Sequence, residues 1–135
     1  MKFKTLTGSI KGIKQPKKHL IKWKEKSRSK RQRLVKLFLQ EYWKDHIVFE
    51  EFPVAGTRLT LDFYNANKRI AIEVQGRQHT EYVPFFHRTK TNYLSQLRRD
   101  QQKLDFCQLN NIHLIEVYDG DELTKSFFRK NKLIL

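Results

Sequence analysis

Two carboxylates, Asp62 and Glu73, lie in neighbouring stretches of alternating apolar and polar residues, and their spacing suggests chemistry. The stretches Leu59–Tyr64 and Arg69–Gln75 flank the polar turn Asn65–Lys68, a pattern that predicts a β-hairpin. Because side chains alternate between the two faces of a strand, a tight hairpin can bring both carboxylates together on one face. Like charges repel there, and partly buried carboxylates need a partner. The pattern therefore indicates a divalent cation held by Asp62 and Glu73.

Other polar residues are placed where they could join this pair. Gln75 shares the face of the second carboxylate, and His79 follows the same strand, where an imidazole could act as general base, leaving-group acid or metal ligand. Asp100 falls on the apolar stripe of a predicted helix, where a charge needs a partner. The alternative for His79 is a structural role. The alternative for Asp100 is an ion pair with Arg98, Arg99 or Lys103, or simple exposure. Glu50 and Glu51 lie on opposite faces of an earlier strand, and one of them could join the metal site or face solvent.

The elements that must position these residues follow from hydrophobic periodicity and from turn and capping residues. In chain order they are a helix from Ser27 or Ser29 to about Lys44, strands at Ile47–Phe52, Leu59–Tyr64 and Arg69–Gln75, a helix at Tyr93–Asn110, a strand at Ile112–Tyr118 and a helix at Glu122–Lys132. This order, α-β-β-β-α-β-α, predicts an α/β fold with a small mixed β-sheet flanked by helices. The helical crossover before the last strand predicts that this strand has a parallel partner.

The net charge of +14 is concentrated in the first quarter of the chain. Residues 1–36 hold fourteen Lys and Arg and one acid, whereas residues 37–135 hold fourteen Lys and Arg and thirteen acids. A segregated basic segment implies a polyanionic partner, most simply nucleic acid. The segment lacks the clear apolar face of a membrane-surface helix, which disfavours a membrane partner.

We interpret residues 1–30 as a basic N-terminal arm that is disordered alone or folds on nucleic acid, and residues 31–135 as the globular domain. Basic residues interleaved with Trp23 favour phosphate contacts with one stacking aromatic, and a solubilising tail is the alternative. The candidate DNA-binding residues are Lys14, Lys17, Lys18, Lys22, Trp23, Lys24, Arg28, Arg31 and, beyond the hairpin, Arg77.

The remaining composition narrows the class of protein further. Cys107 is the one cysteine, which excludes an intramolecular disulfide and a cysteine zinc cluster and fits a reducing compartment. No apolar run approaches the length of a membrane span, and the lysine-rich start has no hydrophobic signal core. We therefore expect a cytoplasmic location.

Three motifs occur in order within about Leu34–Tyr118: LDFY, IAIEVQGRQH and QLRRDQQKLDFCQLNNIHLIEV. Together they resemble the PD-(D/E)XK nuclease superfamily, and most of all its branch of very-short-patch-repair endonucleases and phage-encoded homing endonucleases of the E-D-x-H-D type. The resemblance implies a restriction-endonuclease-like core that hydrolyses DNA phosphodiester bonds with Mg²⁺ (or Mn²⁺), in homing, repair or recombination, in a bacterium or an infected host cell. Because one hydrolytic centre breaks one strand, cleavage of both strands would require two copies, as in a homodimer.

The same resemblance assigns roles to individual residues. Asp62 and Glu73 match the acidic residues of two core strands and would hold the metal ion. His79 matches the branch's histidine and would take or shuttle the proton of the attacking water, with Asp100 orienting its imidazole. Gln75 would position water.

Two positions depart from the superfamily pattern. Gln75 stands where the E-x-K signature has lysine, and a glutamine supplies no positive charge. Gln32 stands near the place where the first helix usually has a glutamate. These departures favour one alternative, a non-catalytic DNA-binding protein on the nuclease scaffold. A second alternative is a subunit of a larger nucleoprotein complex, with the basic arm as its tether.

Overall fold

The computed structural model describes residues 1–76 and 90–135. Its described elements are β1 (Lys2–Lys4), β2 (Ile10–Gly12), the 3-10 helix η1 (Pro16–His19), α1 (Lys30–Trp43), β3 (Val48–Pro53), β4 (Thr60–Asn65), β5 (Ile70–Gln75), α2 (Lys90–Leu109), β6 (His113–Tyr118) and α3 (Lys125–Lys130). Within these residues the protein is mixed α/β, with a four-stranded sheet, a separate two-stranded sheet and three α-helices. The predicted α/β class is confirmed at this level.

The four-stranded sheet has the strand order β3-β4-β5-β6. The first three strands pair antiparallel, and β6 pairs parallel to β5 after the chain has crossed over through α2. The predicted hairpin (β4 and β5) and the predicted parallel pairing of the last strand are both confirmed. The side chain of Ser29 caps α1 by accepting a hydrogen bond from the backbone N–H of Gln32 at 3.1 Å, as a serine at an N-cap is expected to do.

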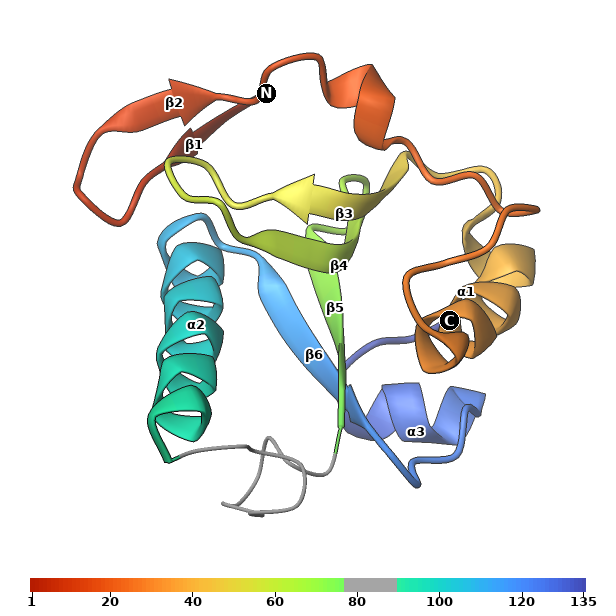
Figure 1. The fold of residues 1–135 in the computed structure, drawn as a ribbon. Coiled ribbons are helices and arrows are strands. Elements are labelled where there is room, and N and C mark those ends of the chain that lie inside the picture. Colours follow the sequence, from red (N-terminus) through yellow and green to blue (C-terminus); the bar gives the residue numbers. More distant parts are fainter. Residues whose placement is uncertain (77–89) are drawn as a thin grey trace.

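Helices cover both faces of this sheet (Figure 1), α2 on one face and α1 and α3 on the other. On the α2 face, the buried ring of Phe106 belongs to the same core cluster as Tyr64 of β4. On the opposite face, Leu39 of α1 and Phe128 of α3 share a second cluster with Phe63 of β4. All of these side chains are at most 2% exposed. The sheet is therefore the middle layer of three.

The first residues of the chain are folded onto the domain, in contrast to the expectation of a disordered arm. β1 and β2 form an antiparallel hairpin, and Phe3 is only 5% exposed. The ring of Phe3 contacts that of Phe52 edge-on, with centroids 5.7 Å apart. The side-chain amide of Asn110 donates to the carbonyl of Lys4 at 3.0 Å and accepts from its N–H at 2.8 Å. Phe3 therefore anchors this segment on the domain, which the high charge of the segment did not indicate.

The chain between η1 and α1 also follows the sheet. Leu20 forms a β-bridge with Phe49 of β3, and the N–H of Ile21 donates to the carbonyl of Val48 at 2.9 Å. Trp23 is half-buried against the core cluster on the α1 face, so its ring has a packing role, while stacking on bases stays a prediction. None of the helices in the described part of the chain has the length and apolarity to span a bilayer.

Candidate functional site

Asp62 on β4 and Glu73 on β5 meet as the hairpin predicted. Each carboxylate accepts a hydrogen bond from the backbone of the other strand: Glu73 Oε2 from the N–H of Asp62 at 2.6 Å, and Asp62 Oδ2 from the N–H of Val74 at 2.8 Å. Asp62 is 8% exposed and Glu73 is 3% exposed. Two largely desolvated acidic groups therefore lie side by side on the α2 face of the sheet.

Lys103 of α2 is the charge partner of this pair in the structure. Its Nζ lies 2.5 Å from Glu73 Oε1, and its side chain is 17% exposed. The sequence analysis considered Lys103 only as a partner for Asp100. Lys103 reaches Glu73 from α2, the helix that covers this face of the sheet (Figure 1).

The electrostatics of the pair favour protons or cations. Burial raises the pKa of Glu73 to about 8, the neighbouring charge of Asp62 adds to this rise, and Lys103 opposes it. Burial likewise raises the pKa of Asp62, against the opposing effects of the Val74 N–H and of Lys103. Because the ionised pair is incompletely neutralised by one ammonium group, a further cation at this place would stabilise it.

A cavity of about 290 Å³ opens over the pair. Gln75 of β5 and Asp100 of α2 line it together with Asp62, Glu73 and Lys103. Four of the five predicted catalytic residues are thus brought to one cavity by three different elements. The fifth, His79, lies outside the described residues.

The predicted metal ligands fit Mg²⁺ by their chemistry. This ion takes oxygen ligands and commonly binds through one or two carboxylates, with water and substrate phosphate in its remaining positions. Asp62 and Glu73 supply two carboxylates, and the Gln75 side chain offers an amide oxygen at the same cavity. No group of three or more His, Cys, Asp or Glu side chains suited to a metal occurs among the described residues, so a metal here would depend on the pair.

Glu51 of β3 is a neighbour of the site that the sequence left undecided. Its neighbours in β3, Glu50 and Phe52, pair with the residues on either side of Asp62 in β4. The charge of Glu51 raises the pKa of Asp62 further. Glu51 Oε2 accepts from Thr60 Oγ1 at 2.8 Å, and Oε1 accepts from Gln32 Nε2 at 3.1 Å. Because Gln32 Nε2 also donates to Glu50 Oε2 at 2.9 Å, this amide joins the two acids. Glu51 has φ of 53°, which breaks the alternation that the sequence argument assumed.

The candidate DNA-binding residues are divided between several elements. Arg28 lines the cavity of the acidic pair. Arg31 already makes two contacts within the protein. It pairs with Asp119 at 2.9 Å and donates a hydrogen bond to the carbonyl of Gln75 at 3.1 Å. Lys17 and Lys18 are on η1. Lys14, Lys22, Trp23 and Lys24 are in the segments on either side of η1, and Arg77 lies outside the described residues.

Comparisons with known proteins find relatives only of unassigned activity. No protein-family model matches the chain, and no solved structure matches it significantly. Similar proteins are the uncharacterized protein 094L of Frog virus 3 (46% identical over 66 residues, 48% of this chain and 43% of that protein) and the uncharacterized protein 307L of Invertebrate iridescent virus 6 (37% identical over 75 residues, 55% and 38%). A third is the uncharacterized protein 033L of Invertebrate iridescent virus 3 (37% identical over 65 residues, 48% and 34%). The chain spans less than half the length of each of these viral relatives.

Proposed function

We propose that this protein is a Mg²⁺-dependent DNA endonuclease with a restriction-endonuclease-like core. The observation that carries the proposal is the pair of buried carboxylates, Asp62 and Glu73, which come from adjacent strands and line one cavity with Gln75 and Asp100. Acidic pairs of this kind, shielded from water and with their pKa values raised, are typical of functional sites. The order of elements from α1 to α3, α-β-β-β-α-β-α, supports the same core.

In this mechanism Asp62 and Glu73 would hold the ion, which when bound would make water more acidic and neutralise negative charge on the phosphate. Gln75 orients water through its amide group. Lys103, at 2.5 Å from Glu73, supplies the positive charge that Gln75 lacks and stabilises the negative phosphate oxygens. By the resemblance to the superfamily, His79 would act as the general base, and Asp100 would orient its imidazole.

The net charge of +14 and its concentration in residues 1–36 support a nucleic-acid substrate. Contacts from this region to phosphates would position the substrate without reading its sequence. Since the relatives are proteins of animal viruses, an infected host cell is the setting we propose, in place of a bacterium.

One observation favours the rival function, a DNA-binding protein without catalysis. The ion pair between Lys103 and Glu73 already satisfies one of the two carboxylates without a metal ion. If this ion pair persists when DNA is bound, the scaffold would bind its ligand and hydrolyse nothing.

The test is cleavage of supercoiled, branched and mismatched DNA with Mg²⁺, with Mn²⁺ and with EDTA. The isosteric variants Asp62→Asn and Glu73→Gln should reduce cleavage to background and should bind DNA in EDTA as tightly as the wild type. Glu122→Gln, a change at an exposed residue before α3, is the matched control and should cleave normally. Cleavage that persists in both site variants would place the chemistry elsewhere, and DNA binding without cleavage of any substrate would establish the rival.

A further inference from the structure

A second cavity, of about 220 Å³, lies beside the segment that leads into α1. Its charged lining consists of five cationic side chains and three acidic ones. The cations are Lys18, Lys22, Lys26, Arg28 and the buried Lys36, and the acids are Glu25, Glu50 and Glu51. These residues come from η1, from the chain that follows it and from α1. Because cations outnumber acids in this lining, the cavity is a candidate site for an anion.

The charges of this cavity do not cancel internally. Lys36 has a side chain that is 1% exposed and pairs with Glu50 at 2.8 Å, so Glu50 neutralises its charge within the protein. Lys22 pairs with Glu25 at 4.0 Å, with both side chains well exposed, an arrangement that contributes little energy. Neither Lys18 nor Lys26 forms an ion pair with another residue in the described ranges 1–76 and 90–135. The cavity therefore retains a surplus of positive charge that a ligand can use.

Two cationic side chains of α1 donate hydrogen bonds to the backbone of the segment that carries Lys22 and Lys26. Arg33 Nη1 donates to the carbonyl of Trp23 at 2.6 Å and to that of Glu25 at 2.7 Å. Lys36 Nζ donates to the carbonyl of Glu25 at 3.0 Å. These three hydrogen bonds hold the segment against α1 at Trp23 and Glu25 before any ligand arrives. A preorganised segment loses less entropy on binding than a disordered arm would.

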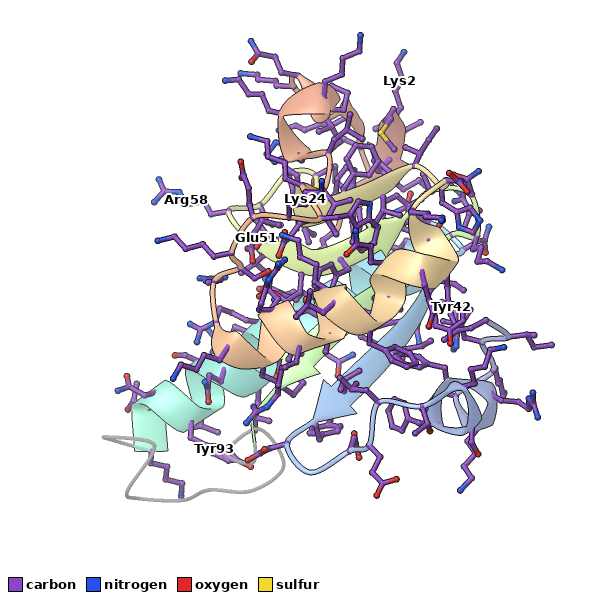
Figure 2. All side chains as sticks on the ribbon, turned by 90° about the vertical axis from the view of Figure 1, so that its right-hand side faces the viewer. Lys2, Lys24, Tyr42, Glu51, Arg58 and Tyr93 are labelled. Atoms are coloured by element: carbon purple, nitrogen blue, oxygen red, sulfur yellow. The ribbon has the colours of Figure 1, made fainter. Side chains whose placement is uncertain are left out.

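Arg28 connects this cationic cavity to the cavity of the acidic pair, since it lines both. Its Nη1 lies 3.3 Å from Glu51 Oε2, and its side chain is 71% exposed. Figure 2 shows Glu51 on the side of the molecule where the chain passes Lys24 and descends to α1. An exposed ion pair of this kind is weak, so Arg28 can turn from Glu51 to a phosphate at little cost.

We infer that the cationic cavity formed by Lys18, Lys22, Lys26 and Arg28 is a phosphate subsite for the backbone of a nucleic acid. The strand bound there continues past Arg28 to the cavity of Asp62 and Glu73. The identity of the ligand as a phosphodiester chain rests on the proposed function. A polymer fits better than a free phosphate ion, because further lysines precede the cavity along the chain at Lys14 and Lys17.

The test is the binding of a fluorescently labelled DNA duplex in EDTA, measured over a range of salt concentrations. The double variant Lys18→Gln/Lys26→Gln should lower the slope of log Kd against log salt by about 2, close to one for each lost phosphate contact. The matched control is Lys2→Gln/Lys11→Gln, which removes two exposed charges from the β1–β2 hairpin and should leave that slope unchanged. All four lysines are exposed, and equal thermal unfolding of the three proteins verifies that their folds are intact.

Equal slopes for the two double variants would overturn the inference. It would also be overturned if the Lys18/Lys26 variant lost binding to vesicles of anionic phospholipid and kept its binding to DNA, since the ligand would then be a membrane surface. The nuclease proposal is judged separately, by cleavage with Mg²⁺. A protein that binds DNA through this cavity and cleaves nothing would end that proposal alone, whereas cleavage with equal slopes would end only this inference.

Discussion

The metal-free protein should lose stability as the pH rises from about 5 to about 8, and Glu73 should be the main cause. Burial and the charge of Asp62 raise the pKa of Glu73 from 4.5 to about 8. Between these two pH values the folded protein holds a proton on Glu73 that the unfolded chain has already released. Because the folded state binds more protons there, the free energy of unfolding must fall as the pH rises. This contribution is complete below the unfolded pKa and is lost as the pH passes through the folded one.

The size of the effect follows from the same shift. Each unit of pKa difference corresponds to about 1.4 kcal/mol, which makes about 5 kcal/mol the upper limit for the whole interval. Asp62 and Glu73 titrate as a coupled pair, and Lys103 offsets part of the repulsion between them. We therefore expect a loss of about 2–4 kcal/mol between pH 5 and pH 8.

The assay is urea unfolding at several pH values in EDTA, for the wild type and for Glu73→Gln. The variant carries no carboxylate at this position, so the difference between the two curves isolates the titration of Glu73 from that of the histidines. Glu122→Gln should follow the wild type. With Mg²⁺ at pH 8, the wild type should regain stability and Glu73→Gln should not, because a ligand that binds only the folded state stabilises it.

Two results would refute this reasoning. The first is a wild-type stability that stays level or increases from pH 5 to pH 8 in EDTA. The second is a Glu73→Gln variant that shows the same pH dependence as the wild type. A missing response to Mg²⁺ would count against the metal site and would leave the pKa argument intact.

Two further predictions concern residues that position the site and the fold. Lys103→Met should lower stability by about 3 kcal/mol at pH 8, where it leaves a buried carboxylate without its partner, and by much less at pH 5, where Glu73 is protonated; equal losses at both pH values in urea unfolding would contradict the ion pair as the reason. Phe3→Ala should cost about 3–5 kcal/mol in the same assay, because it empties a core position that is 5% exposed. The control Ile10→Ala, at a position 67% exposed, should change stability by no more than about 0.5 kcal/mol, and a Phe3→Ala variant as stable as this control would mean that the hairpin is not part of the core.

Local patterns in the sequence were enough to predict the β4–β5 hairpin, the parallel pairing of β6 and the N-cap of α1. The alternation of residues in the two hairpin strands placed Asp62 and Glu73 on one face, because a strand has a period of two and a short turn restricts the register. The crossover helix predicted the parallel last strand for a similar reason, since such a connection leaves few topologies. The serine before α1 was recognisable because an N-cap needs a side-chain acceptor.

The tertiary structure decided which distant residues complete the site. Lys103 is 30 residues from Glu73 in the chain. The sequence alone offered Asp100 as its partner, and only the packing of α2 on the sheet shows that Lys103 pairs with Glu73. The positive φ of Glu51 altered the face that simple alternation assigned to it.

The N-terminal segment shows the same division. Its composition determined its charge, and the sequence also contained its anchors, Phe3 and Trp23. Its order depends on contacts such as that between Lys4 and Asn110, which are 106 residues apart. Periodicity within one element reports which face is apolar, but the partner of that face belongs to another element. Whether a basic segment folds therefore depends on a surface that its own sequence does not contain.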